Sequence, residues 1–185
     1  TGNQTKQPLS FVANNNATLN LDVNGGTVTS AGTNPNNSIF GVVAQNSTGN
    51  LSFDGLTVNN STSSAFVTRY DSGSDGTYEI TNTTATGSQA VGAALFVKNG
   101  ADVVVNYDGL NVSGSGQGVA ADGIRIDVNG LGTTADLNFN NVTADGASRR
   151  GIGIQYANKA SGSVTQFDGI SAQNAQQDGV MLEVR

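Results

Sequence analysis

The chain has 185 residues, a formal net charge of −6, and neither cysteine nor histidine. The lack of cysteine excludes a disulfide framework and thiolate metal sites. The eight Lys and Arg residues are scattered along the sequence, which argues against a nucleic-acid or anionic-membrane partner. No run approaches the about 18 apolar residues of a membrane span. With 36% hydrophobic residues the composition supports one continuous core, so we expect a single domain over residues 1–185.

A repeat begins with the first predicted strand, at residues 9–13, where two inward positions are separated by one residue. The same pair of positions recurs along the chain, as Leu9 and Phe11, Ser38 and Phe40, Ala65 and Val67, Ala94 and Phe96, Ile124 and Ile126, Ile152 and Ile154, and Val180 and Leu182. The second members of these pairs are 27 to 30 residues apart. Because a period of this length is typical of a solenoid, the repeat predicts six turns of a coil.

A second strand in each turn is predicted to end in a left-handed bend. The blocks PheAspGlyLeuThrVal at 53–58 and TyrAspGlyLeuAsnVal at 107–112 share a glycine at the third place. The equivalent places carry only Gly or Asn, the residues that best tolerate a positive φ: Gly25, Gly55, Asn82, Gly109, Asn141 and Gly169. Apolar and polar residues alternate after the bend, which predicts a third short strand.

Together these elements predict an all-β fold, a right-handed parallel β-helix of about six turns with three short strands in each. Equivalent strands of successive turns pair in parallel about 4.8 Å apart, so six turns span roughly 29 Å. The right hand follows from the general handedness of parallel crossovers. Turn length varies, and we assign the variation to two loops in each turn, for example 113–121 and 129–135.

The coil period, the Gly or Asn bend and the inward aliphatic columns carry a resemblance that covers nearly the whole chain. The chain resembles the right-handed parallel β-helix (pectin-lyase-like) superfamily, which includes pectate lyases, polygalacturonases, phage tailspikes and autotransporter passenger domains. It is closest in character to the bacterial adhesin passenger domains of this group. The resemblance implies either polysaccharide chemistry or attachment at a cell surface.

The enzymatic members of the superfamily are a poor match for these residues. Polygalacturonase-like enzymes use paired Asp residues and a Gly-His-Gly, whereas this chain has no histidine and no AspAsp pair. Pectate-lyase-like enzymes use acidic calcium ligands with a basic residue, and the best set here is Asp122, Arg150 and Asp178, in successive turns. We interpret this set as a charge ladder between turns. We therefore assign no catalytic residue, no metal site and no cofactor.

One outward column of the first strand is unexpectedly apolar. Ile39, Phe66 and Leu95 are predicted to form an exposed stripe on successive turns, and such a stripe usually marks a contact with a partner. Two other interpretations stay open: a loop folds over the stripe, or the register in these turns is shifted by one residue. The stripe is our candidate partner face.

The first and last predicted strands lie in the same column of the coil, six turns apart. Leu9 and Phe11 at one end, and Val180 and Leu182 at the other, would present apolar side chains and unpaired backbone groups. We therefore expect either that the chain is a segment of a longer coil or that copies stack end to end.

These observations favour a noncatalytic role at the outside of a cell. We expect a structural shaft or adhesin module of a secreted or cell-surface bacterial protein, which binds a glycan or a protein or associates with itself. The alternative is a fragment of a polysaccharide lyase or hydrolase of the same superfamily. Ultraviolet-absorbing products released from polyuronates would support that alternative.

Overall fold

The computed structural model describes residues 9–29 and 37–185, which form strands joined by turns and loops. The strands are β1 (Leu9–Ala13), β2 (Thr18–Thr29), β3 (Ile39–Val43), β4 (Thr48–Asn59), β5 (Phe66–Tyr70), β6 (Asp75–Thr81), β7 (Thr84–Thr86), β8 (Ala93–Lys98), β9 (Asp102–Asp108), β10 (Ile124–Asn129), β11 (Thr134–Asn140), β12 (Ile152–Ala157), β13 (Ser161–Asp168) and β14 (Val180–Val184). In this part of the chain, no helix has the length and apolar character needed to cross a membrane.

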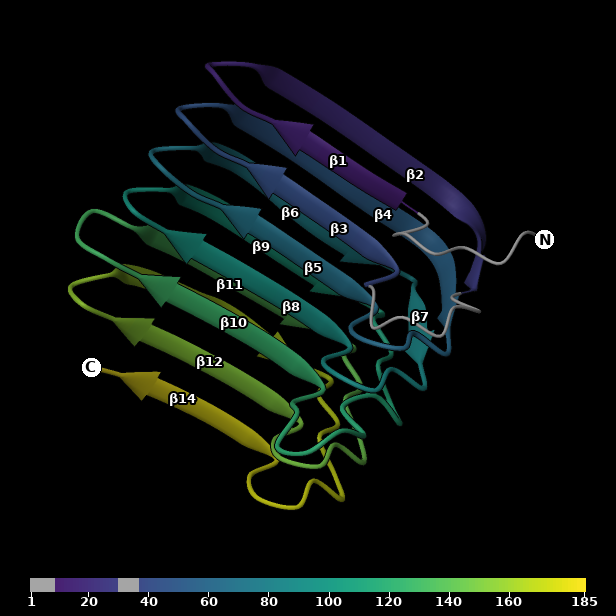
Figure 1. Cartoon of the computed structure of the whole chain (residues 1–185). Coiled ribbons are helices and arrows are strands. Elements are labelled where there is room, and N and C mark those ends of the chain that lie inside the picture. Colours follow the sequence, from purple (N-terminus) through teal and green to yellow (C-terminus); the bar gives the residue numbers. More distant parts are fainter. Residues whose placement is uncertain (1–8, 30–36) are drawn as a thin grey trace.

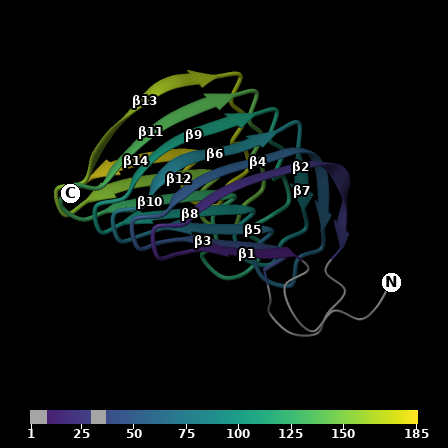
Figure 2. The same cartoon turned by 90° about the horizontal axis from the view of Figure 1, so that it is seen from above.

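The strands form two parallel sheets, one on each side of the coil. Sheet A has the order β1-β3-β5-β8-β10-β12-β14, and sheet B has the order β13-β11-β9-β6-β4-β2. Figure 1 shows sheet A in front of sheet B, with successive turns stepping from β1 down to β14. The view from above in Figure 2 shows the two sheets as opposite walls of the coil. The predicted parallel β-helix of about six turns is therefore confirmed.

The predicted left-handed bend lies at the end of the sheet B segment in every turn. Its six residues all have positive φ: Gly25 (68°), Gly55 (63°), Asn82 (46°), Gly109 (66°), Asn141 (51°) and Gly169 (61°). Beyond the bend the third strand is short. It continues β2 and β4, forms β7, and is reduced to single parallel bridges at Asn111, Thr143 and Ser171.

The interior of the coil is one apolar core with a column of aromatic rings along its axis. The rings of Phe11, Phe53, Tyr78, Tyr107, Phe139 and Phe167 follow one another with centroids 5.4 to 6.2 Å apart. All but the first pair meet edge to face, the geometry that aromatic pairs favour. Burial raises the pKa of Tyr78 and Tyr107, so both phenols stay protonated and serve as packing groups.

The predicted register of sheet A is wrong by one residue in three turns. Ile39 pairs with Leu9 on the preceding turn and with Phe66 on the next, so both belong to an inward column. Leu95 pairs with Thr68 and Ile126, so it also belongs to an inward column. Each of the three side chains has an exposed fraction of 0%. Ile39, Phe66 and Leu95 are therefore core residues, and the partner face assigned to them does not exist.

The physical reason for this error lies in consecutive apolar residues. Strands β3, β5 and β8 begin with IlePhe, PheVal and AlaAlaLeuPhe, so a period of two does not identify the inward member. The shift turns Phe40, Val67 and Phe96 to the outer side of sheet A. Of these, Phe96 and Phe40 are partly exposed, and Val67 has an exposed fraction of 8%.

Candidate functional site

The outer side of sheet A carries an aromatic ring surrounded by three cations. Phe96 on β8 has the Arg69 guanidinium carbon at 5.6 Å from its ring centroid, the Lys98 ammonium at 5.3 Å and the Arg125 guanidinium carbon at 5.6 Å. These cations come from β5, β8 and β10, three neighbouring strands of sheet A. We call Arg69, Phe96, Lys98 and Arg125 the cationic patch.

Parallel pairing accounts for this grouping. Arg69 is in register with Phe96 on the next turn, and Phe96 is in register with Asp127. Lys98 follows Phe96 by two residues, and Arg125 precedes Asp127 by two, so all of these side chains lie on one side of the sheet. The ring is attracted to cations through its negative face, which lets three like charges gather around it.

Only one of the three cations of the patch has a carboxylate partner among the described residues. Arg125 pairs with Asp127, its Nη2 at 2.6 Å and its Nε at 3.0 Å from one carboxylate oxygen. Arg69 and Lys98 form no ion pair with any described residue. Arg69 is exposed and Lys98 is partly exposed. The patch therefore offers two uncompensated positive charges beside a partly exposed aromatic ring.

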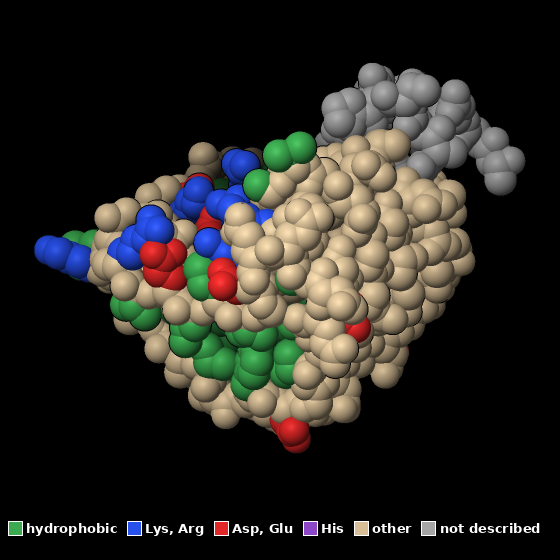
Figure 3. All heavy atoms as spheres, turned by 90° about the horizontal axis from the view of Figure 1, so that it is seen from below, with side chains coloured by type: hydrophobic (Ala, Val, Ile, Leu, Met, Phe, Trp, Pro, Cys, Tyr) green, Lys and Arg blue, Asp and Glu red, His purple; other side chains and the backbone are tan. Residues whose placement is uncertain are grey.

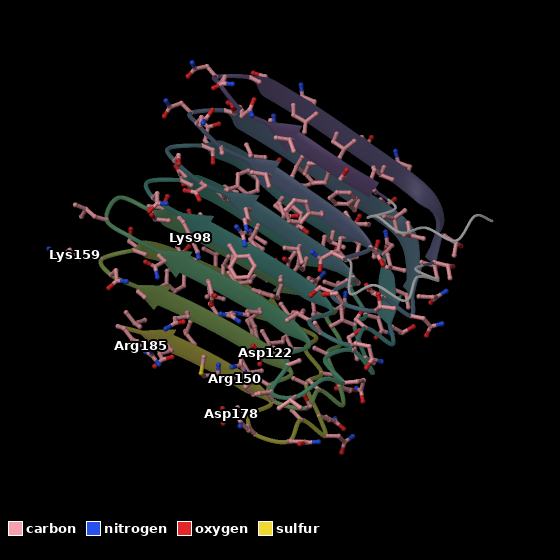
Figure 4. All side chains as sticks on the ribbon, viewed as in Figure 1. Lys98, Asp122, Arg150, Lys159, Asp178 and Arg185 are labelled. Atoms are coloured by element: carbon pink, nitrogen blue, oxygen red, sulfur yellow. The ribbon has the colours of Figure 1, made fainter. Side chains whose placement is uncertain are left out.

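The predicted charge ladder lies next to the patch, at the start of β10, β12 and β14. Figure 4 shows Asp122, Arg150 and Asp178 following one another there, and their backbones are hydrogen-bonded in succession through Gly123 and Gly151. Their side chains do not form one continuous ladder. Arg150 approaches Asp178 at 3.6 Å, whereas Asp122 is held by Arg149, which is not a member of the predicted set.

Asp122 and Arg149 form the most buried ion pair of the described residues. Arg149 Nε donates to one Asp122 oxygen at 2.7 Å, and Nη2 donates to the other. The Asp122 side chain is 1% exposed. The hydrogen bond from Arg149 to Asp122 raises the pKa of the guanidinium, which is therefore charged at all accessible pH values. A carboxylate that accepts two parallel hydrogen bonds from one guanidinium is held firmly in place, so the pair has a structural role between two turns.

The charges of the two sheets are strongly segregated. The strands of sheet B contain no Lys or Arg but contain eight acidic residues: Asp22, Asp54, Asp75, Glu79, Asp102, Asp108, Asp136 and Asp168. None of them forms an ion pair with a described residue, and each ion pair of the described residues lies on the side of sheet A. Figure 3 shows Lys and Arg gathered with a few acidic groups on one side of the molecule. Charged residues that are spread along the sequence are thus separated in space, with most of the described cations on the side of sheet A and unpaired carboxylates on the side of sheet B.

On the outer side of sheet B, several acidic residues accept hydrogen bonds from hydroxyl and amide groups and keep their negative charge. Thr81 Oγ1 donates to Asp54 at 2.7 Å and Asn82 Nδ2 donates to the same oxygen at 2.9 Å. These two bonds hold the pKa of Asp54 below its ordinary value. Asn140 donates to Asp108, and Ser163 donates to Asp136, in the same way. This face is a polar, negatively charged ladder.

The strands proposed to stack end to end lie at opposite ends of sheet A. On β14, Val180 and Leu182 are exposed by 43% and 56%, whereas Leu9 and Phe11 on β1 are partly buried against the core. Figure 3, seen from the side of β14, shows a patch of hydrophobic side chains. End-to-end stacking stays a prediction.

No group of three or more His, Asp or Glu side chains is placed to hold a metal ion within residues 9–29 and 37–185. The predicted sites do not include the cationic patch, because the sequence pattern places Phe96 in the inward column. With the correct register, an aromatic flanked by Arg69 and Arg125 on the adjacent turns would have been visible in the sequence.

Comparison with known proteins adds no further assignment. No family model matches the chain, and neither a curated protein nor a solved structure is similar to it at a significant level. The function must therefore be inferred from the coil itself and from the side chains on its outer walls.

Proposed function

We propose that the chain is a rigid module of an extracellular or cell-surface protein that binds an acidic glycan through the cationic patch. The observation that carries the proposal is the pair of uncompensated cations, Arg69 and Lys98, next to the Phe96 ring. A guanidinium and an ammonium bind carboxylate or sulfate groups, and a flat ring provides the apolar surface against which the C–H face of a sugar packs.

The shape of the coil supports a binding role over a catalytic one. Parallel strands on six turns make a stiff wall, and the patch spans neighbouring turns of that wall, so a polymer can lie along the coil and meet side chains at a regular spacing. Two carboxylates on the side of sheet A, Asp122 and Asp127, are both bound to arginines. Neither is available as a general base.

Titration calorimetry with polygalacturonate, and with the fully methyl-esterified polymer as an uncharged control, tests the proposal. We expect binding to the acidic polymer only, and a loss of roughly tenfold or more in affinity for the double variant Arg69→Gln/Lys98→Gln and for Phe96→Ala. Lys159→Gln is the matched control, because Lys159 is exposed on a turn away from the patch and also forms no ion pair with a described residue.

Two results would contradict the proposal. One is the absence of binding to any acidic polymer of a panel that also includes sulfated chains. The other is an equal loss of affinity in Lys159→Gln, which would mean that total charge, and not the patch, controls binding. Release of ultraviolet-absorbing unsaturated sugars during the titration would instead favour the lyase alternative.

A further inference from the structure

The segregated charges of the two sheets point to a second binding partner, another copy of the same chain. Two cations of the sheet A side lack a carboxylate, and eight carboxylates of the sheet B strands lack a cation, among the described residues. A folded chain cannot bring these charges together, because they lie on opposite walls of the coil (Figure 2). Two copies side by side can.

Asp75 and Asp102 are the carboxylates best placed for such a contact. They begin β6 and β9, they are direct partners in the parallel register, and both are exposed. Like charges opposite each other on adjacent strands are unfavourable. The Thr134 hydroxyl donates to Asp102, and no described Lys or Arg reaches either carboxylate. A pair of external cations would relieve this repulsion.

Arg69 and Lys98 supply a pair of cations on adjacent turns, with Lys98 two residues beyond Phe96, the residue that pairs with Arg69. They belong to β5 and β8, which are neighbours in sheet A, just as β6 and β9 are neighbours in sheet B. Both sheets are built from the same turns, so their strands have one common repeat distance, about 4.8 Å. Two copies with aligned axes can therefore bring the two cations of one copy to the two carboxylates of the other, across two adjacent turns.

We propose that the outer side of sheet A in one copy binds the outer side of sheet B in another, with Arg69 and Lys98 opposite Asp75 and Asp102. The two surfaces differ, so the contact is heterologous and leaves a free surface of each kind for the next copy. Exposed ion pairs are individually weak and are screened by salt, so we expect association at high protein concentration that is weakened by added salt.

The test is a charge swap followed by sedimentation at fixed ionic strength. One variant carries Arg69→Glu and Lys98→Glu, and the other carries Asp75→Lys and Asp102→Lys. We expect the wild type to associate as its concentration rises, each variant alone to stay monomeric, and an equal mixture of the two variants to associate again. Both variants keep a net negative charge, so nonspecific attraction between oppositely charged proteins does not explain recovery in the mixture.

The possible outcomes separate this inference from its alternatives. A wild type that stays monomeric overturns it, and so does a mixture that does not recover. Association that persists in both variants would also overturn it, because contacts at the coil ends do not depend on these four residues. An Asp75→Asn/Asp102→Asn variant adds no cation, so it should bind acidic glycan as the wild type does but should not associate laterally. Failure of the proposed function and failure of lateral association are therefore observed independently.

Discussion

Arg149 holds the buried carboxylate of Asp122 through both of its oxygens, across the boundary between two turns of the coil. The Asp122 side chain is 1% exposed, and that of Arg149 is 24% exposed. The pair ties the loop before β12 to the start of β10, beside the outer side of sheet A. We therefore expect that breaking this ion pair lowers the free energy of unfolding more than breaking an exposed pair would.

We expect Arg149→Met to lower the free energy of unfolding by about 3 kcal/mol, because it leaves a buried carboxylate without a cation. Arg150→Met is the control and should cost about 1 kcal/mol or less, since its partner Asp178 is 56% exposed and 3.6 Å away. Urea unfolding measures both. If the two variants lost the same free energy of unfolding, another group would have to compensate the charge of the Asp122 carboxylate.

Leu95 and Phe96 are neighbours on β8 with opposite orientations, and they provide a direct test of the register. Leu95→Ala should cost about 2 to 5 kcal/mol, because the side chain is fully buried and leaves a cavity. Phe96→Ala should cost less than about 1.5 kcal/mol, because the ring is partly exposed. If thermal or urea unfolding gave the reverse order, sheet A would be shifted by one residue in this turn.

Gly55 tests the left-handed bend without interference from packing. Its φ is 63°, and a Cβ at this site would have no atom nearer than 3.8 Å. Gly55→Val should therefore cost more than about 1 kcal/mol from backbone strain alone. Gly55→Asn should be much milder, since Asn82 and Asn141 already occupy equivalent bends. Similar unfolding midpoints for the two variants would argue against the bend. Gly169 is less suitable, because a Cβ there would lie 2.5 Å from Asn141 Oδ1.

Asp54 predicts a pH dependence of stability. Hydrogen bonds from Thr81 and Asn82 lower the pKa of Asp54 from its ordinary value of 3.8, so the charged form is favoured in the folded state. Its stabilising contribution is complete well above pH 3.8 and is lost as the pH falls through the lower, folded pKa. We expect the stability difference between wild type and Asp54→Ala to be constant above about pH 5 and to shrink in more acidic solution. If the stability difference between wild type and Asp54→Ala grew as the pH fell, the pKa of Asp54 would be raised in the folded state, not lowered.

The bend and the second column of the coil could be predicted from the sequence for a local reason. Only Gly and Asn readily adopt a positive φ, so the six bend residues mark one place in every turn, from Gly25 to Gly169. In four of the six turns the residues before and after the bend alternate between apolar and polar, which identifies their inward members. The resulting alignment of Phe53, Tyr107, Phe139 and Phe167 agrees with the strand pairing.

The sheet A column had no comparable marker, and only tertiary pairing decided it. Phe66 and Val67, or Leu95 and Phe96, are equally apolar neighbours, so the choice of inward residue depends on hydrogen bonds to the adjacent turns. The cationic patch depends on the same choice. Arg69, Lys98 and Arg125 are separated by 29 and 27 residues in the chain and meet around Phe96 because successive turns stack in parallel. Composition determined the kind of fold, whereas the register of stacking determined which charges became neighbours.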